Sequence, residues 1–207
     1  MPKGILLDRD GTLIDVVRDE ETGAFHTAFH PSHVRMLSGA IEGLRLLQAE
    51  GYLLAIATNQ PGPAKGQFSA DAVLRTNRAL VDTLAQAGIS IAQVAVCMHH
   101  PQGGDGGDPS LVRECSCRKP RPGLLDSLVS ELGLDRDGSW MVGDSAADGA
   151  AGHAAGLRSA LVFASTRCEL CPLRPRIPGS LPDSLSHLPE VHGPDLVTIA
   201  RGILARG

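Results

Sequence analysis

Ile5–Ile14, with the sequence ILLDRDGTLI, is the stretch from which the fold of this 207-residue chain can be predicted. The short apolar run at its start predicts a β-strand that is buried on both faces. Two acids, Asp8 and Asp10, follow this strand, and side chains two positions apart on an extended segment point the same way. Gly11 then allows the backbone to turn sharply beside them. The stretch therefore predicts a strand of a parallel α/β sheet whose carboxyl end presents two carboxylates to one site.

Two carboxylates in this arrangement suit a divalent cation. One of them could attack phosphorus while the other transfers a proton. A strand end followed by two solvated acids and a glycine turn would give the same Asp-x-Asp pattern. The functional interpretation therefore depends on what the rest of the chain supplies.

The composition predicts a globular protein of one domain over residues 1–207, because a chain that is 43% hydrophobic can bury a substantial core. A formal net charge of −4 argues against a nucleic-acid-binding protein. No apolar run reaches the roughly 18 residues of a membrane span, and no signal peptide precedes the first strand. We expect a cytoplasmic, monomeric protein that does not bind membranes, with a core over about 4–164 and a Pro-rich C-terminal extension over about 165–207.

Strands and helices alternate along the chain. Apolar runs predict strands over 52–57, 91–96, 140–142 and 160–164, and helical periodicity predicts helices over 39–50, 69–87, 122–132, 147–156 and 196–204. This alternation predicts an α/β fold with a doubly wound, mainly parallel sheet. The polar segment 15–38, which contains three histidines, is expected to form a loop or a small flap; an ordinary surface excursion and a substrate contact fit it equally.

Polar residues follow two further predicted strands. Thr58, Asn59 and Gln60 come after the strand 52–57, and their hydroxyl and amide groups could donate hydrogen bonds to a phosphate. A simple turn would explain the same residues. Asp144 follows the strand 140–142 and would complete the carboxylate set, and Asp148 lies one helical turn later.

Cys97-x-His99 and Cys115-x-Cys117 bracket a Gly/Asp-rich loop that has almost no apolar residues to bury. Such a loop cannot hold itself in place by packing. Three thiols and one imidazole match a tetrahedral structural zinc site, and alternate residues on each arm can present both ligands to one side. His100 is the competing nitrogen ligand, and unrelated thiols are the alternative interpretation.

A group that fixes Cys117 also fixes the two cations that follow it, Arg118 and Lys119. If they lie beside the carboxylates they could bind a phosphoryl group, although a solvated Arg-Lys pair is the simpler interpretation. Cys168-x-x-Cys171 with His187 and His192 has the nominal spacing of a zinc finger, but the intervening prolines exclude a finger helix.

The motifs together resemble the haloacid-dehalogenase (HAD) superfamily over about residues 4–164. They are Asp-Arg-Asp-Gly-Thr (8–12), Thr58, Lys119 and Gly-Asp-x-x-x-Asp (143–148). The Cys/His loop, Cys-Arg-Lys-Pro (117–120) and Thr-Asn-Gln-Pro-Gly-Pro-Ala-Lys-Gly-Gln-Phe (58–68) are similar to the branch of histidinol phosphatases and heptose bisphosphate 7-phosphatases. The last run favours the heptose side.

The resemblance implies a Mg²⁺-dependent phosphomonoesterase that acts on a small phosphorylated sugar. Asp8 would be the nucleophile and Asp10 the general acid and base. The resemblance implies that the Asp8 carboxylate, the Asp10 backbone carbonyl and Asp144 hold Mg²⁺, with Asp148 just outside the ligand set.

For the phosphoryl group, the resemblance implies contacts from Thr58, Asn59 and Lys119, while Arg118 and Gln60 would face the rest of the substrate. The intervals between the motifs leave little room for a large cap domain, so an open site is expected. Histidinol phosphate is the alternative substrate. A zinc-stabilised binding module without activity and a phosphotransferase to an acceptor other than water are the competing functions.

Overall fold

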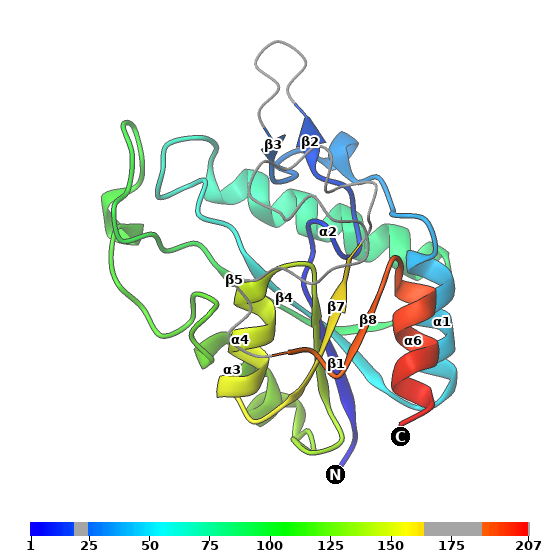
Figure 1. The fold of residues 1–207 in the computed structure, drawn as a ribbon. Helices are drawn as coiled ribbons and strands as arrows, with labels where there is room; N and C mark the ends of the chain where they lie inside the picture. Colours follow the sequence, from blue (N-terminus) through cyan, green and yellow to red (C-terminus); the bar gives the residue numbers. More distant parts are fainter. Residues whose placement is uncertain (19–24, 164–187, 207) are drawn as a thin grey trace.

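The computed structural model describes residues 1–18, 25–163 and 188–206. Its centre is a sheet of six parallel strands in the order β5-β4-β1-β6-β7-β8 (Figure 1). The strands are β1 (Gly4–Leu7), β4 (Leu53–Asn59), β5 (Ile91–Cys97), β6 (Trp140–Gly143), β7 (Arg158–Val162) and β8 (Val191–Gly193). β2 (Val17–Arg18) and β3 (Phe25–His26) form a separate antiparallel ribbon.

Helices cover both faces of this sheet. They are α1 (Ala40–Ala49), α2 (Ala70–Gln86), α3 (Gly123–Leu132), α4 (Ala146–Ala154) and α6 (Leu196–Leu204), with short 3₁₀ helices η1 (Pro31–His33) and η2 (Pro109–Leu111). One hydrophobic cluster joins α1, α2 and α6 to one face, and a second joins α3 and α4 to the other. The prediction of a doubly wound, parallel α/β sheet is therefore confirmed.

The alternation of side chains along β1 shows why the strand is apolar throughout. Ile5 and Leu7 belong to the first cluster, whereas Leu6 belongs to the second. Successive side chains on a strand point to opposite faces, so a strand covered by helices on both sides must be apolar at every position. All four residues of β1 are buried.

Local interactions define several helix ends. Ser69 caps α2 by accepting a hydrogen bond from the Ala72 N–H, and Gly133 ends α3 in the left-handed conformation. The strand expected over 160–164 begins earlier, at Arg158. Strand β8 was not predicted, because it is short and lies between Pro189 and Pro194 in a Pro-rich region. The core extends beyond residue 164, since α6 packs into the first cluster.

The order of the strands locates the functional edge. The chain passes from β1 to β4 and β5 on one side, and then to β6, β7 and β8 on the other side. Ligands of doubly wound folds bind where this winding direction reverses, at the carboxyl ends of the strands. Here the reversal lies at β1, where β4 pairs on one side and β6 on the other.

The segment after β1 covers part of this edge, as the sequence suggests. The β2–β3 ribbon lies above the carboxyl ends of the strands in Figure 1. Phe29 stacks on Phe68, which lies between β4 and α2, with ring centroids 5.1 Å apart. Gly62 makes room for this ring, because a Cβ at that position would collide with Phe68. The segment from Phe25 to Ser38 is therefore a small flap that packs against the loop after β4 through this stacking contact.

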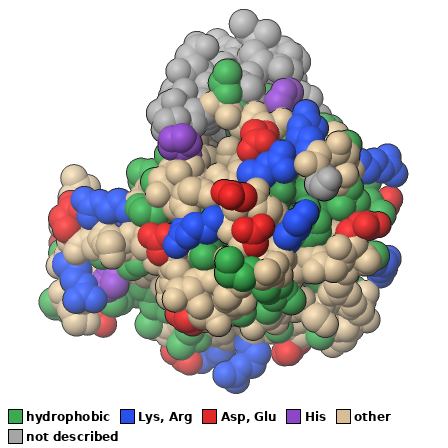
Figure 2. Space-filling view, turned by 90° about the horizontal axis from the view of Figure 1, so that it is seen from below, with side chains coloured by type: hydrophobic (Ala, Val, Ile, Leu, Met, Phe, Trp, Pro, Cys, Tyr) green, Lys and Arg blue, Asp and Glu red, His purple; other side chains and the backbone are tan. Residues whose placement is uncertain are grey.

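The face of the molecule opposite the β2–β3 ribbon carries side chains of both charges. Figure 2 shows acidic and basic side chains interspersed on the face seen from below in Figure 1. Within the described ranges, none of the helices has the length and apolar character that a membrane span requires. Cys168, Cys171 and His187 lie outside the described residues, so the zinc-finger spacing has no structural account here.

Candidate active site and Cys/His cluster

Three carboxylates from two strand ends meet at the reversal point. Asp8 follows β1, and Asp144 and Asp148 follow β6. One carboxylate oxygen from each lies within 4.8 Å of the others. Gly11 makes this approach possible: its φ is 87°, and a Cβ there would collide with the Asp144 carboxylate. The arrangement concentrates negative charge where a cation could bind.

Lys119 brings positive charge to the same place. Its Nζ donates to Asp8 Oδ1 at 2.8 Å and to the Ala57 carbonyl at 2.7 Å, and it lies 2.6 Å from Asp148 Oδ1. These three acceptors occupy all the N–H groups of the ammonium. Lys119 is only 4% exposed, and burial acts to lower its pKa. The charges of Asp148 and Asp8 outweigh burial and raise the pKa, so the ammonium stays protonated.

Asp8 is an unusual carboxyl group. Its pKa is raised from 3.8 to about 7, chiefly by burial, with Lys119 acting to lower it and the charges of Asp148 and Asp144 acting to raise it. Without an additional cation, the carboxylate is therefore only half ionised near neutral pH. A divalent cation among the three carboxylates would favour the ionised form.

Asp148 has both of its oxygens engaged. Oδ1 faces Lys119, and Oδ2 accepts from the Ser145 backbone N–H at 3.1 Å and from its hydroxyl. This is a capping box at the start of α4. Gly143 allows the close packing, because a Cβ there would collide with Asp148. The position of Asp148 suits it to hold Lys119.

The residues at the end of β4 split into two groups. The Asn59 side chain donates to the Lys119 carbonyl at 3.0 Å and accepts from the Lys119 N–H at 3.1 Å. It therefore fixes the Lys119 backbone. Gln60 Nε2 donates to Thr58 Oγ1 at 2.9 Å and to Asp10 Oδ2 at 2.7 Å. The Thr58 hydroxyl thus accepts a hydrogen bond and keeps its own proton for another acceptor.

Two arginines beside these groups differ in their environment. Nη1 of Arg118 is buried without a hydrogen-bond partner among the described residues. Arg9 is completely buried and donates two hydrogen bonds to the Asp10 carboxylate. Arg9 was not among the site residues predicted from the sequence. The signal that could have identified it is its charge, because it lies between Asp8 and Asp10 in a motif that was expected to be buried.

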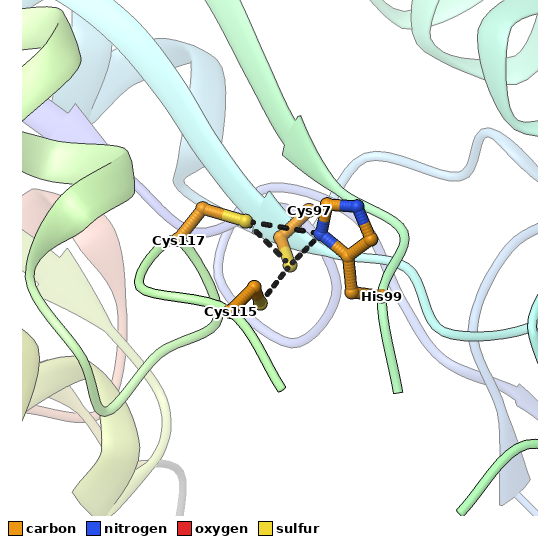
Figure 3. A group of neighbouring side chains, drawn as sticks. All are labelled: Cys97, His99, Cys115 and Cys117. Carbon is orange, nitrogen blue, oxygen red and sulfur yellow. Dashed lines mark hydrogen bonds between the residues drawn. The ribbon is translucent and has the colours of Figure 1, made fainter. Parts of the chain in front are cut away.

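The four ligand atoms of Cys97, His99, Cys115 and Cys117 lie within 4.8 Å of one another (Figure 3). Sulfur atoms are separated by 3.7 Å for Cys97–Cys115 and 3.1 Å for Cys97–Cys117, and His99 Nδ1 lies 3.3 Å from Cys117 Sγ. A tetrahedral zinc with Zn–S bonds of about 2.3 Å would hold sulfurs about 3.8 Å apart. The cluster is therefore of the right size for zinc, with modest expansion.

The histidine of the cluster is His99. His100 Nδ1 instead accepts a hydrogen bond from the Gln102 N–H, and His100 is absent from the described metal-ligand groups. Burial and the neighbouring Arg113 lower the pKa of His99, which favours the neutral imidazole that metals bind. Burial raises the pKa of the Cys97 thiol, as does its hydrogen bond with Cys117.

Comparison with known proteins places this geometry in context. A family model described as HAD-hydrolase-like matches residues 116–170. The D-glycero-β-D-manno-heptose-1,7-bisphosphate 7-phosphatase of Pasteurella multocida is 36% identical over 162 residues, covering 78% of this chain and 82% of that protein. The enzyme of the same name from Escherichia coli K12 is 32% identical over 187 residues, covering 90% and 91%.

A solved structure is similar along nearly the whole chain. It is the D,D-heptose 1,7-bisphosphate phosphatase from B. bronchiseptica, complexed with magnesium and phosphate. It is 28% identical, covers 99% of both chains and has a TM-score of 0.72.

Proposed function

Because this chain belongs to the HAD superfamily, and within it to the family of heptose bisphosphate phosphatases, we propose that it hydrolyses the 7-phosphate of D-glycero-D-manno-heptose 1,7-bisphosphate. The observation that carries the proposal is the convergence of Lys119 with Asp8, Asp144 and Asp148 at one edge of the sheet. An ammonium group beside a carboxylate nucleophile offsets the charge repulsion from an anionic ester.

Asp8 is the nucleophile in this proposal. One of its oxygens accepts from Lys119, and the other attacks phosphorus as the bond from phosphorus to the sugar oxygen breaks. Asp10 gives its proton to the departing oxygen. It then takes a proton from the water that attacks the aspartyl-phosphate, which releases phosphate and restores Asp8.

Mg²⁺ fits the acidic group because hard cations prefer oxygen ligands. The Asp8 carboxylate, Asp144 and the Asp10 backbone carbonyl would hold it; Asp148, whose oxygens are engaged with Lys119 and Ser145, would stay outside the ligand set. When bound, the ion offsets the negative charge of the phosphoryl group. The magnesium in the similar structure from B. bronchiseptica supports this choice of metal.

Contacts to the phosphoryl group come from Thr58 and Lys119 in this proposal, and the Lys119 N–H that Asp8 accepts in the free protein turns to the phosphoryl group when substrate binds. Asn59 contributes by holding the Lys119 backbone, and its own contact with phosphate remains a prediction. Arg118, with a buried nitrogen that has no protein partner in the described part of the chain, faces the rest of the substrate together with Gln60.

The proposal is tested by measuring phosphate release from the purified protein with heptose 1,7-bisphosphate and with histidinol phosphate. We expect Mg²⁺-dependent release that a chelator abolishes, with a clear preference for the heptose. ³¹P NMR of the product should show that the phosphate at position 1 is retained. A preference for histidinol phosphate would contradict the sugar assignment, and no release from any phosphomonoester would contradict the phosphatase.

The Cys/His cluster binds one structural zinc ion in this proposal. Cys97, at the end of β5, and Cys117, two residues before Lys119, tie the loop to the site. A loop without a hydrophobic core depends on such a tie, so metal binding contributes to folding. Zinc thereby helps to hold Lys119 in place.

Replacing Cys115 with Ser is expected to reduce zinc from about one equivalent to near zero. It should also lower the melting temperature and the activity, because the Lys119 segment loses its support. Elemental analysis, thermal melting and phosphate release measure the three effects. Ser116→Ala, at an exposed position in the same loop, is the matched control and should leave all three unchanged. A stable, active Cys115→Ser protein without zinc would contradict the structural role.

A further inference from the structure

The Asp10 carboxylate is held by donors from three parts of the chain. Arg9 donates to it twice, from Nε to Oδ2 at 2.9 Å and from Nη2 to Oδ1 at 3.3 Å. Gln60 Nε2 donates to Oδ2 at 2.7 Å, and the Ala28 backbone N–H donates to Oδ1 at 2.8 Å. Each carboxylate oxygen therefore accepts two hydrogen bonds, which defines its orientation.

Arg9 is itself fixed by burial and by hydrogen bonds to two other segments. Its side chain is 0% exposed, and an arginine is buried only where its charge and donors are satisfied. Nη1 donates to Asn77 Oδ1 on α2 at 2.6 Å, and Nη2 donates to the Ala28 carbonyl on the flap at 2.5 Å. Arg9 thus joins the end of β1 to both α2 and the flap.

We propose that Arg9, supported by Asn77, is a positioning residue that orients Asp10 for proton transfer to the leaving oxygen. The inference rests on the proposed function and deepens it. In the free protein four hydrogen bonds occupy the acceptor sites of Asp10, so its acid form carries the proton on Oδ2 in place of the hydrogen bond from Gln60. As the bond between phosphorus and the leaving oxygen breaks, this proton moves to that oxygen and Asp8 forms its bond to phosphorus. Arg9 takes no part in this exchange; it holds the carboxyl group where the proton is needed.

This role predicts an effect that depends on the leaving group. A sugar alkoxide is a poor leaving group and needs the proton, whereas p-nitrophenolate leaves without it. Well-placed general acids contribute roughly 10²–10⁴-fold. A residue that acts only through Asp10 must therefore affect sugar phosphates far more than aryl phosphates. Damage to the metal or phosphate contacts would affect both substrates equally.

The test compares kcat/KM for the sugar bisphosphate with kcat/KM for p-nitrophenyl phosphate, because this parameter includes the departure of the leaving group. Arg9→Lys keeps the charge but cannot form the paired contact with Asp10. We expect it to reduce kcat/KM for the sugar substrate about 100-fold and for the aryl substrate about threefold or less. Equal reductions for the two substrates, or none in the folded variant, would overturn the inference.

Asn77 provides a second test that leaves Arg9 in place. Asn77→Leu removes the acceptor for Arg9 Nη1. It should lower kcat/KM for the sugar substrate about tenfold, compared with about 100-fold for Arg9→Lys, and should leave kcat/KM for the aryl substrate nearly unchanged. Asn77→Asp keeps that acceptor and should retain the wild-type ratio, since the Asn77 Nδ2 has no hydrogen-bond partner among the described residues to lose. Identical ratios for the Leu and Asp variants would overturn the inference even if no Arg9 variant folds.

Arg75→Gln is the control, because Arg75 lies on the same helix and, among the described residues, forms an exposed ion pair with Asp71 alone. It should change neither substrate. Failure of the proposed function can be distinguished from failure of the inference. Absence of Mg²⁺-dependent turnover in the wild-type protein would contradict both. Wild-type turnover combined with equal losses in the variants would remove the inference alone.

Discussion

Asp8→Asn is expected to abolish phosphate release, with a fall of at least about 10⁴-fold, because an amide cannot form the aspartyl-phosphate. The substitution changes the shape of the side chain little. Lys119 also keeps Asp148 and the Ala57 carbonyl as acceptors, so the fold should persist. Thermal melting establishes that the variant is folded, and a continuous phosphate assay measures its activity.

The matched control for this substitution is Asp71→Asn, since Asp71 is exposed on α2. It should retain wild-type activity. Turnover of folded Asp8→Asn at the wild-type rate would show that another group attacks phosphorus. The proposed mechanism would then be wrong.

Lys119→Met should damage both activity and stability. Removing one charged donor from a site of this kind costs roughly 10²–10³-fold in kcat. Breaking a buried ion pair typically costs about 3–5 kcal/mol of unfolding free energy, because the partner charge is left uncompensated. Here Asp8 and Asp148 would both lose their partner, beside Asp144. Enzyme assays and denaturant unfolding measure the two effects.

The stability loss in Lys119→Met should depend on pH. The pKa of Asp8 is already raised from 3.8 to about 7, and without the ammonium it should rise further. A carboxyl group whose pKa is higher in the folded state than in the unfolded state destabilises the fold as pH rises from the unfolded-state pKa to the folded-state pKa. The variant should therefore lose stability as pH increases through neutrality, more steeply than the wild type.

Lys3→Met, at an exposed position before β1, is the control for the loss of a lysine. It should show neither the loss of activity nor the pH dependence. If Lys119→Met were as stable and as active as this control, the ammonium would have no role in balancing the carboxylates.

The convergence of the site could be predicted because parallel strands share one carboxyl edge. Asp8, Thr58 and Asp144 each follow a strand that the apolar runs identified, and the order of the strands brings their ends together. Lys119 comes from a loop, and its proximity was inferred from the Cys/His motifs. The structure brings its ammonium to Asp8, which the spacing of residues alone could not establish.

The partners of Asp10 could not be predicted, because they depend on contacts between distant segments. Ala28 acts through its backbone N–H, which leaves no signal in the residue type. Gln60 is a turn residue by its sequence context, and only the packed structure directs its amide to Asp10. Strand β8 was missed for a different reason: prolines on both sides hide a short strand whose pairing is set by the sheet edge.

The most direct test of the mechanism is to quench the enzyme during turnover and search for a phosphoryl group on the peptide that contains Asp8. We expect wild-type protein with Mg²⁺ and substrate to carry one phosphoryl group there, labile to hydroxylamine as an acyl phosphate must be, and Asp8→Asn to carry none. A phosphoryl group on any other residue, or turnover with no labelled protein under conditions that slow hydrolysis of the intermediate, would contradict the account.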